Sequence, residues 1–362
     1  MFNPSRFRVA RKKRRLSKTR LAELIGVELR TVSAYESGEF APSPDTASRI
    51  AETLKFPVEF FFGDDLFEPS VETASFRSLA RMSAGIREGA LASGSMAMLL
   101  SDWIGRRFAL PDSDLPDLRG EEPENAAIEL RHGWGLGETP IRNMVHMLES
   151  KGIRVFAMAE ETRDVDAFSL WRDRTPFIFL NTVKSTERSR FDAAHELGHL
   201  VLHREVGPYG KEAEHEANQF ASAFLMPRDS VFAHAPVLPS LRTLIQLKKQ
   251  WIVSVTALAF RLHSLDLIKE FHYRKLCIEI SRNGYRTNEP NGAPPEMSLV
   301  LGKVFQLLRS EGVTKADVAR DLKYYVEDLD KLIFGLMMTG LKGGGNGGHT
   351  GPTKAPPIHL VK

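Results

Sequence analysis

The chain has only one cysteine and no long hydrophobic run. Cys277 is the single cysteine among 362 residues, so one chain can form neither a disulfide framework nor a zinc site built from thiolates. No window approaches the roughly 18 consecutive apolar residues of a membrane-spanning helix, and no apolar signal-peptide segment follows the charged N-terminus. These absences argue against secretion and membrane insertion, and they predict a cytoplasmic protein.

Acidic residues are absent from one stretch near the N-terminus. Residues 6–20 contain no Asp or Glu, although the chain as a whole has a net charge of only +3. A block of cations is typical of a surface that contacts nucleic acid; the alternatives are a solubilising segment or one that lies on a membrane surface. The cations are Arg6, Arg8, Arg11, Lys12, Lys13, Arg14, Arg15, Lys18 and Arg20.

Residues 15–54 have the pattern of short helices separated by tight turns. Ser17 can cap the first helix, and Gly26 supplies the residue that a helix-turn-helix needs in its turn. A second helix is expected from about residue 28 to residue 37, and Ser43 opens a third. The pattern predicts a DNA-binding helix-turn-helix, the alternative being a small helical bundle used for dimerisation.

This segment resembles the Cro/C1-type (XRE family) DNA-binding domain. Lys18 stands where that family usually has glutamine and Glu28 where it usually has serine or threonine, which leaves the base preference open. The resemblance implies a recognition helix in the major groove of double-stranded DNA and a homodimer on paired half-sites. The contacts that it implies are Lys18, Thr19, Leu29, Arg30, Thr31 and Ser33, while Lys12 of the basic block is an expected phosphate contact.

A histidine pair with metal-ligand spacing lies in the sequence HELGH at residues 195–199. Residues four apart lie above one another on a helix, so His195 and His199 can share one zinc ion. Glu196 projects about 100° away from His195, where it can reach a water at the metal without being a ligand. The pattern predicts a catalytic zinc site of the metalloprotease kind, and not a solvated helix face that carries these residues by chance.

A zinc hydrolase needs a third protein ligand, which the segment KEAEHEANQFASAFLMP at residues 211–227 can supply. This segment reads as a second helix that ends at Pro227, with an apolar stripe flanked by three glutamates. Helical geometry does not choose among Glu212, Glu214 and Glu216.

The blocks RFDAAHELGHLVLH (190–203) and EANQFASAFLMP (216–227) together resemble the ImmA/IrrE metallopeptidases, gluzincin-like enzymes often fused to a Cro/C1-type helix-turn-helix. The resemblance implies Glu216 as the third zinc ligand and Glu196 as the general base. It also implies site-specific cleavage of a protein substrate, typically a transcriptional repressor, in stress, mobile-element or defence responses. No residue is assigned as an electrophilic helper; the candidates are Tyr209, His203 and His215.

A competing function needs no catalysis. A transcription factor or antitoxin-like repressor could keep a peptidase-like domain that senses a ligand or a partner without turnover. The intact positions of His195, His199 and Glu196 favour the enzyme.

The segments around these motifs predict a mixed α and β fold. Residues 67–117 read as mostly helical, and Pro140 is expected to begin a helix that Gly152 closes. The runs 153–158, 167–171 and 176–181 read as strands, and their short connections imply an antiparallel or mixed sheet beside the zinc helix. The strand PFIFLN (176–181) is the candidate edge for an extended peptide substrate, the alternative being a central buried strand.

After Pro227, residues 239–274 read as helices. LCIEISRNGY (276–285) suggests a strand and a turn, EMSLVLGKVFQLLRSEG (296–312) a helix, and residues 313–336 a second motif that mimics a helix-turn-helix. The mixed charge of this last motif favours an interaction or dimer module over a second DNA reader.

These signals predict an α+β protein with five parts. The first two are an all-α helix-turn-helix domain (1–65) and a helical connector (66–125). A mainly helical zinc metallopeptidase domain with a small mixed or antiparallel sheet (126–270) precedes an α-rich regulatory or dimerisation module (271–340). The tail (341–362) has too few apolar groups to order itself.

Overall fold

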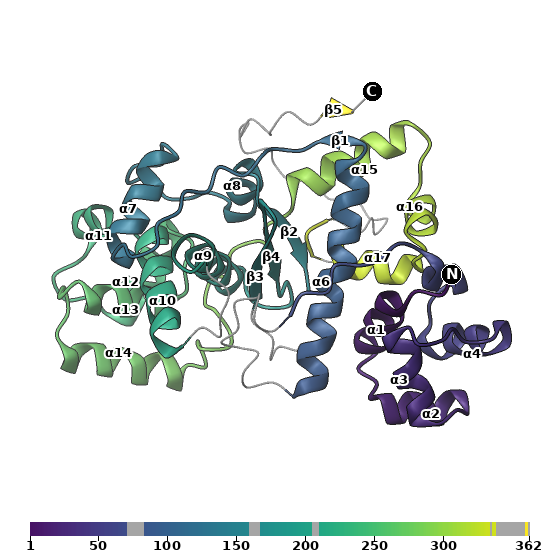
Figure 1. The fold of residues 1–362 in the computed structure, drawn as a ribbon. Helices are drawn as coiled ribbons and strands as arrows, with labels where there is room; N and C mark the ends of the chain where they lie inside the picture. Colours follow the sequence, from purple (N-terminus) through teal and green to yellow (C-terminus); the bar gives the residue numbers. More distant parts are fainter. Residues whose placement is uncertain (71–82, 159–166, 205–209, 334, 338–358, 361–362) are drawn as a thin grey trace.

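The computed structural model describes residues 1–70, 83–158, 167–204, 210–333, 335–337 and 359–360. It is mainly helical, with one small mixed sheet near its centre (Figure 1). This is the predicted fold class. The predicted disordered tail falls mostly outside the described residues.

The N-terminal helices form the predicted helix-turn-helix. Ser17 caps α2 by accepting a hydrogen bond from the Arg20 amide, and Gly26 ends it in the left-handed conformation at φ 67°. Ser43 caps α4 in the same way. The helices are α1 (Pro4–Lys13), α2 (Lys18–Ile25), α3 (Leu29–Ser37), α4 (Pro44–Leu54) and the short η1 (Val58–Phe62).

A long buried helix, α6 (Ala84–Gly105), connects this unit to the rest of the molecule. It packs against α1 on one side and against the sheet on the other (Figure 1). The predicted helical stretch 67–117 is therefore helical only in part, since residues 106–117 leave the helix and residues 71–82 lie outside the described residues. After α6, β1 (Phe108–Ala109) pairs antiparallel with β5 (His359–Leu360) near the end of the chain.

The central sheet has the strand order β2-β4-β3, from β2 (Arg154–Ala157), β3 (Ala167–Arg172) and β4 (Thr175–Leu180). Strands β2 and β4 are parallel, whereas β3 and β4 are antiparallel, as a mixed sheet requires. The expectation that PFIFLN is an edge strand is wrong, because Phe179 pairs with Phe156 of β2 and with Phe168 of β3. Its continuous apolar character reflects burial on both faces.

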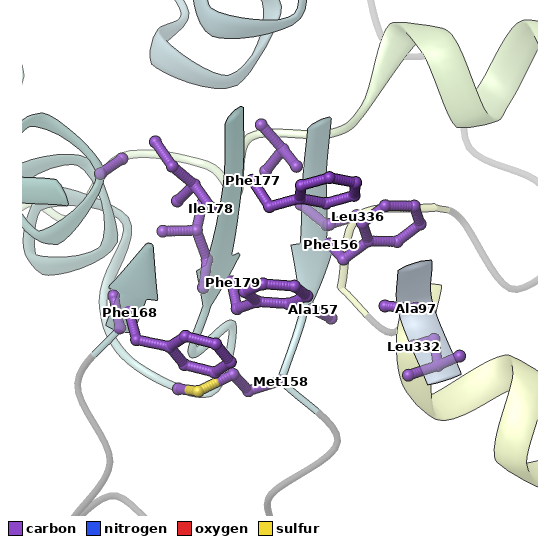
Figure 2. Packing of buried hydrophobic residues seen from close by; sticks show 14 of the residues in the cluster. Ala97, Phe156, Ala157, Met158, Phe168, Phe177, Ile178, Phe179, Leu332 and Leu336 are labelled. Atoms are coloured by element: carbon purple, nitrogen blue, oxygen red, sulfur yellow. The ribbon is translucent and has the colours of Figure 1, made fainter. Parts of the chain in front are cut away.

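Figure 2 shows how the two faces of the sheet are used. Phe179 and Phe168 stack with ring centroids 4.4 Å apart on the face that α6 covers. Ile178 points to the opposite face, where the helix carrying the HELGH sequence packs. The sheet is thus a rigid layer between the connecting helix and the candidate site.

The helices around the site follow the prediction with one shifted boundary. Helix α8 begins at Met144 with Asn143 as its cap, four residues after the predicted start at Pro140. Helix α9 carries the HELGH sequence and packs most extensively against α10. The helices of this part are α7 (Pro123–Gly133), α8 (Met144–Ser150), α9 (Thr186–Leu202), α10 (Lys211–Leu225), α11 (Arg228–His234), α12 (Leu241–Leu247), η2 (Lys248–Gln250) and α13 (Val255–Ser264).

The predicted strand at 276–285 is wrong, because these residues continue helix α14 (Glu270–Arg282) and its terminal turn. Leu276 and Ile280, four residues apart, form its buried stripe, so helical burial overrides the alternating pattern. Three further helices follow: α15 (Leu299–Ser310), α16 (Lys315–Leu322) and α17 (Val326–Ile333). Helix α17 contacts β2 and α6, and Leu332 and Leu336 lie beside the sheet (Figure 2).

Among the described residues, no helix combines the length and the apolar character needed to cross a membrane.

Candidate functional site

The two histidines of α9 and one glutamate of α10 converge on a single point. The Nε2 atoms of His195 and His199 lie 3.1 Å apart. The Glu214 carboxylate places Oε2 3.4 Å from the first of these nitrogens and Oε1 3.4 Å from the second. A metal site of this kind needs at least three His, Cys, Asp or Glu side chains close together. Within the described part of the chain, His195, His199 and Glu214 form the one such group.

Their spacing fits a tetrahedral metal. Ligands at about 2.0–2.1 Å from zinc in a tetrahedron are about 3.3 Å from one another. Two imidazole nitrogens and one carboxylate form a donor set that zinc accepts, and a fourth position remains for water or substrate. The residues therefore fit a catalytic zinc ion.

Electrostatics hold two of the three groups in the form that binds a cation. Burial lowers the pKa of His199 to about 4, so its ring is neutral at pH 7. Burial alone would raise the pKa of Glu214, but its interactions with His195 and His199 lower it to about 2. Burial likewise opposes a charge on His195, but Glu214 and Glu196 raise its pKa. A neutral imidazole and an ionised carboxylate are the ligating forms of these side chains.

The structure corrects the expected third ligand, since it brings Glu214 and not Glu216 to the histidine pair. Two residues apart on a helix, the side chains point about 200° away from each other, so only one can face α9 at this site. The Glu214 side chain is 5% exposed and that of Glu216 is 40% exposed. Glu216 instead bonds to His203, with its Oε2 2.7 Å from Nε2.

Gly198 permits the close approach of α9 and α10 that brings Glu214 within reach. A Cβ at this position would lie 3.0 Å from the ring of Phe220 and 3.3 Å from the Cα of Ala217. These contacts are tighter than ordinary packing. The glycine of the HELGH sequence therefore has a structural task that the metal-ligand spacing alone does not explain.

Glu196 is buried beside this cluster and is held by the sheet. Its carboxylate accepts a hydrogen bond from the Ser169 hydroxyl at 2.7 Å. Ser169 lies on β3, and nothing in the sequence distinguishes it from any other serine in a strand. Of the candidate helpers, His203 contacts both His199 and Glu216, His215 is exposed, and Tyr209 falls outside the described residues.

A second candidate surface lies on α2 and α3 at the opposite end of the molecule (Figure 1). Lys18, Leu29, Arg30 and Ser33 border one open depression. The Arg30 side chain is 85% exposed and lies 2.7 Å from Glu28, whereas Lys18 lies 3.0 Å from the buried Glu36. Thr19 is exposed and Thr31 is half-buried. Of the residues expected to contact DNA, Lys18, Leu29, Arg30 and Ser33 thus share one surface, on which Leu29 is 47% exposed.

Two protein-family models match the chain. Residues 148–263 match the IrrE N-terminal-like domain of the M78 peptidases, and residues 7–61 match a helix-turn-helix domain. The chain joins a helix-turn-helix domain to an IrrE N-terminal-like peptidase domain. This confirms the expected fusion, and the peptidase match contains the whole cluster of His195, His199 and Glu214. No curated protein matches the chain.

The sequence suggested that the basic block at residues 6–20 forms a surface that contacts nucleic acid. In the structure, most of these cations contact other groups of the protein instead. Arg11 is 5% exposed, and its guanidinium lies 2.6 Å from the equally buried Glu36. Arg8 and Lys12 both contact Glu68, at 2.7 Å and 3.3 Å. Arg6 is buried and donates to the carbonyl of Asp64. These cations bind the protein itself; the Lys12 side chain is 29% exposed beside Glu68, and its expected contact with a phosphate stays a prediction.

Two further cations tie the helix-turn-helix domain to distant parts of the chain. Lys13 is buried and donates to the Ser93 hydroxyl of α6 at 2.7 Å. Burial lowers the pKa of this lysine to about 7. Arg14 makes a two-pronged contact with Asp328 of α17, at 2.9 Å and 2.7 Å. Helix α1 is therefore an internal connector between the DNA-binding helices and the rest of the molecule.

Proposed function

We propose that the protein is a DNA-binding zinc metallopeptidase that regulates transcription by cleaving a partner protein. The convergence of His195, His199 and Glu214 beside a buried Glu196 carries this proposal. The helix-turn-helix domain supports a regulator that acts on double-stranded DNA. The substrate expected from the resemblance is a transcriptional repressor in a stress, mobile-element or defence response, and the DNA-bound form is expected to be a homodimer.

The chemistry assigned to the site is hydrolysis of a peptide bond. His195, His199 and Glu214 would hold a zinc ion, which would supply polarisation of the scissile carbonyl and an acidified water near neutral pH. Glu196 takes a proton from the attacking water and passes it to the leaving amine. Ser169 fixes the Glu196 carboxylate, with its hydroxyl as the donor.

Replacing Glu196 with glutamine tests the proposal. The variant is expected to keep zinc and DNA binding but to lose turnover by about 100-fold to 10,000-fold, because glutamine cannot accept the proton. The measurement compares the proteomes of cells expressing the wild type, Glu196→Gln and, as a matched control, Glu212→Gln, which changes an exposed residue of α10. A regulator cleaved with the wild type and the control but not with Glu196→Gln identifies the substrate. Normal promoter regulation by Glu196→Gln would favour a sensor without turnover.

A further inference from the structure

A third histidine extends the metal cluster along α9. His203 lies four residues after His199 and caps the C-terminal end of the helix. Its Nδ1 is 3.1 Å from Nδ1 of His199, and its Nε2 is 2.7 Å from Oε2 of Glu216. The His203 side chain is 12% exposed, so this contact is shielded from water on most sides. His199 therefore has the metal cluster on one ring nitrogen and the His203–Glu216 pair on the other.

The ring protons of His199 and His203 can be assigned in one way that satisfies both contacts. A neutral imidazole has one N–H, and a metal bound at Nε2 of His199 requires that N–H to be at Nδ1. His203 must then accept at Nδ1 and carry its own proton at Nε2. That proton points at the Glu216 carboxylate, which is an acceptor when ionised. The contact between His199 and His203 and the contact between His203 and Glu216 thus each have one donor and one acceptor.

We propose that His203 and Glu216 are positioning residues that orient His199 for the metal. Glu216 acts through His203: its charge fixes the proton of His203 at Nε2, so Nδ1 carries no proton and accepts from His199. This fixes the tautomer and the ring orientation of His199 and increases the basicity of its Nε2. The inference rests on the proposed zinc site and gives a function to the glutamate that is not a ligand.

The arrangement argues against a ligand role for either residue. The nitrogen of His203 nearest to His199 faces Nδ1, which is the side of the ring away from Glu214. Glu216 touches the outer nitrogen of His203, one full ring further from the cluster. Loss of either residue should therefore weaken zinc binding without abolishing it, by about 10-fold to 100-fold.

Zinc affinity of the full chain, measured by competition with a chromophoric chelator, tests the proposal. Glu216→Ala and His203→Phe should each weaken zinc binding by about 10-fold to 100-fold. Glu216→Gln should lie between Glu216→Ala and the wild type, since its amide oxygen still accepts from His203. His203→Asn should also be milder than His203→Phe, because its amide oxygen can accept from His199. Glu212→Gln, on the same helix, is the control and should bind zinc like the wild type.

Two readouts separate positioning from a merely structural role. If Glu216 acts through His203, the double variant Glu216→Ala/His203→Phe should bind zinc no more weakly than His203→Phe alone. With Co²⁺ in place of zinc, the visible absorption bands of both single variants should shift, because the His199 ligand is reoriented. Thermal unfolding of the metal-free variants should match that of the metal-free wild type.

The outcomes distinguish this inference from the proposed function. Wild-type zinc affinity and unchanged Co²⁺ bands in Glu216→Ala and His203→Phe would overturn the positioning role while leaving the zinc site intact. Additive losses in the double variant would overturn the claim that Glu216 acts through His203. A wild-type chain that binds no zinc, or zinc binding unaffected by Glu214→Ala, would instead overturn the proposed function.

Discussion

Helices α9 and α1 carry the most distinctive ionisable residues of the sequence, and the fold uses the two sets differently. On α9, His195 and His199 meet Glu214 with ligand atoms 3.1–3.4 Å apart, a spacing that suits an enclosed cation. On α1, Arg11 and Arg14 meet acidic residues directly, at 2.6 Å and 2.7 Å. Both sets are largely buried, so a dense group of ionisable side chains does not by itself indicate that an ion binds there. What indicates one is a group of donor atoms that share a common centre.

The largest expected effect lies in the metal cluster. Glu214→Ala should weaken zinc binding by more than the roughly 100-fold limit expected for residues outside the ligand set. Glu216→Ala should stay within that limit. Zinc content after dialysis against a chelator measures both, with His195→Ala as the reference for loss of a ligand. The opposite ranking of the two glutamates would restore Glu216 as the ligand and remove the contrast between them.

The next effect concerns the buried ion pair of α1. Arg11→Ala leaves the Glu36 carboxylate buried with Lys18 as its remaining cation. Breaking a buried pair in this way costs about 3–5 kcal/mol, and the second cation favours the lower end of this range. Arg20→Ala, which breaks an exposed pair with Glu23, should cost at most about 1 kcal/mol. Thermal unfolding of the helix-turn-helix domain within the full chain compares the two, and equal shifts would contradict an internal role for α1.

A smaller effect separates the DNA-binding face from α1. Arg30→Ala should lower affinity for a specific duplex by about 1–3 kcal/mol if Arg30 contacts a base edge. Lys12→Ala should leave both the affinity and its salt dependence nearly unchanged, because Lys12 already contacts Glu68. Fluorescence anisotropy at several salt concentrations measures both. A clear drop in the salt dependence of Lys12→Ala would make Lys12 a phosphate contact after all.

The last effect is a pH dependence of stability from Lys13. Its pKa falls from 10.5 to about 7 on folding, so the unfolded chain binds more protons between these values. The lysine therefore destabilises the fold at pH 7 and below, and this penalty shrinks as the pH rises toward 10.5. Lys13→Met should be more stable than the wild type at pH 7. Denaturant unfolding from pH 7 to pH 10 should show the gap narrowing; a constant gap would contradict the burial of a neutral lysine.

Local spacing was sufficient to predict the parts of the site that lie on one helix. The four-residue step from His195 to His199 and the position of Glu196 follow from helical geometry alone. The third ligand did not follow, because Glu214 and Glu216 flank the apolar stripe of α10 on opposite sides, at roughly 90° and 70° from its centre, respectively. The choice between them depends on how α10 packs against α9, and this packing cannot be predicted from the sequence of α10 alone.

The errors in the fold have a similar origin. The partners of the basic block are far away in sequence, as in the contact between Arg14 and Asp328, 314 positions apart. Residues 276–285 contain an alternating run, but packing of Leu276 and Ile280 made it a helix. The central position of β4 followed from strand pairing and was only hinted at by its uniform apolar character. In each case tertiary contacts decided between local alternatives.

The contact between Arg14 and Asp328 has a consequence for biosynthesis. The DNA-binding domain is N-terminal, so it emerges first from the ribosome and can fold before the remainder of the chain has been made. Its first helix then carries cations whose partners, Ser93 and Asp328, have not yet been translated. Until α6 emerges the nascent chain exposes Lys13, and until α17 emerges it exposes Arg14, to nearby polyanions, including the ribosomal RNA itself. A product truncated before residue 328 would keep Arg14 exposed permanently, and it should bind nucleic acid less selectively than the finished protein.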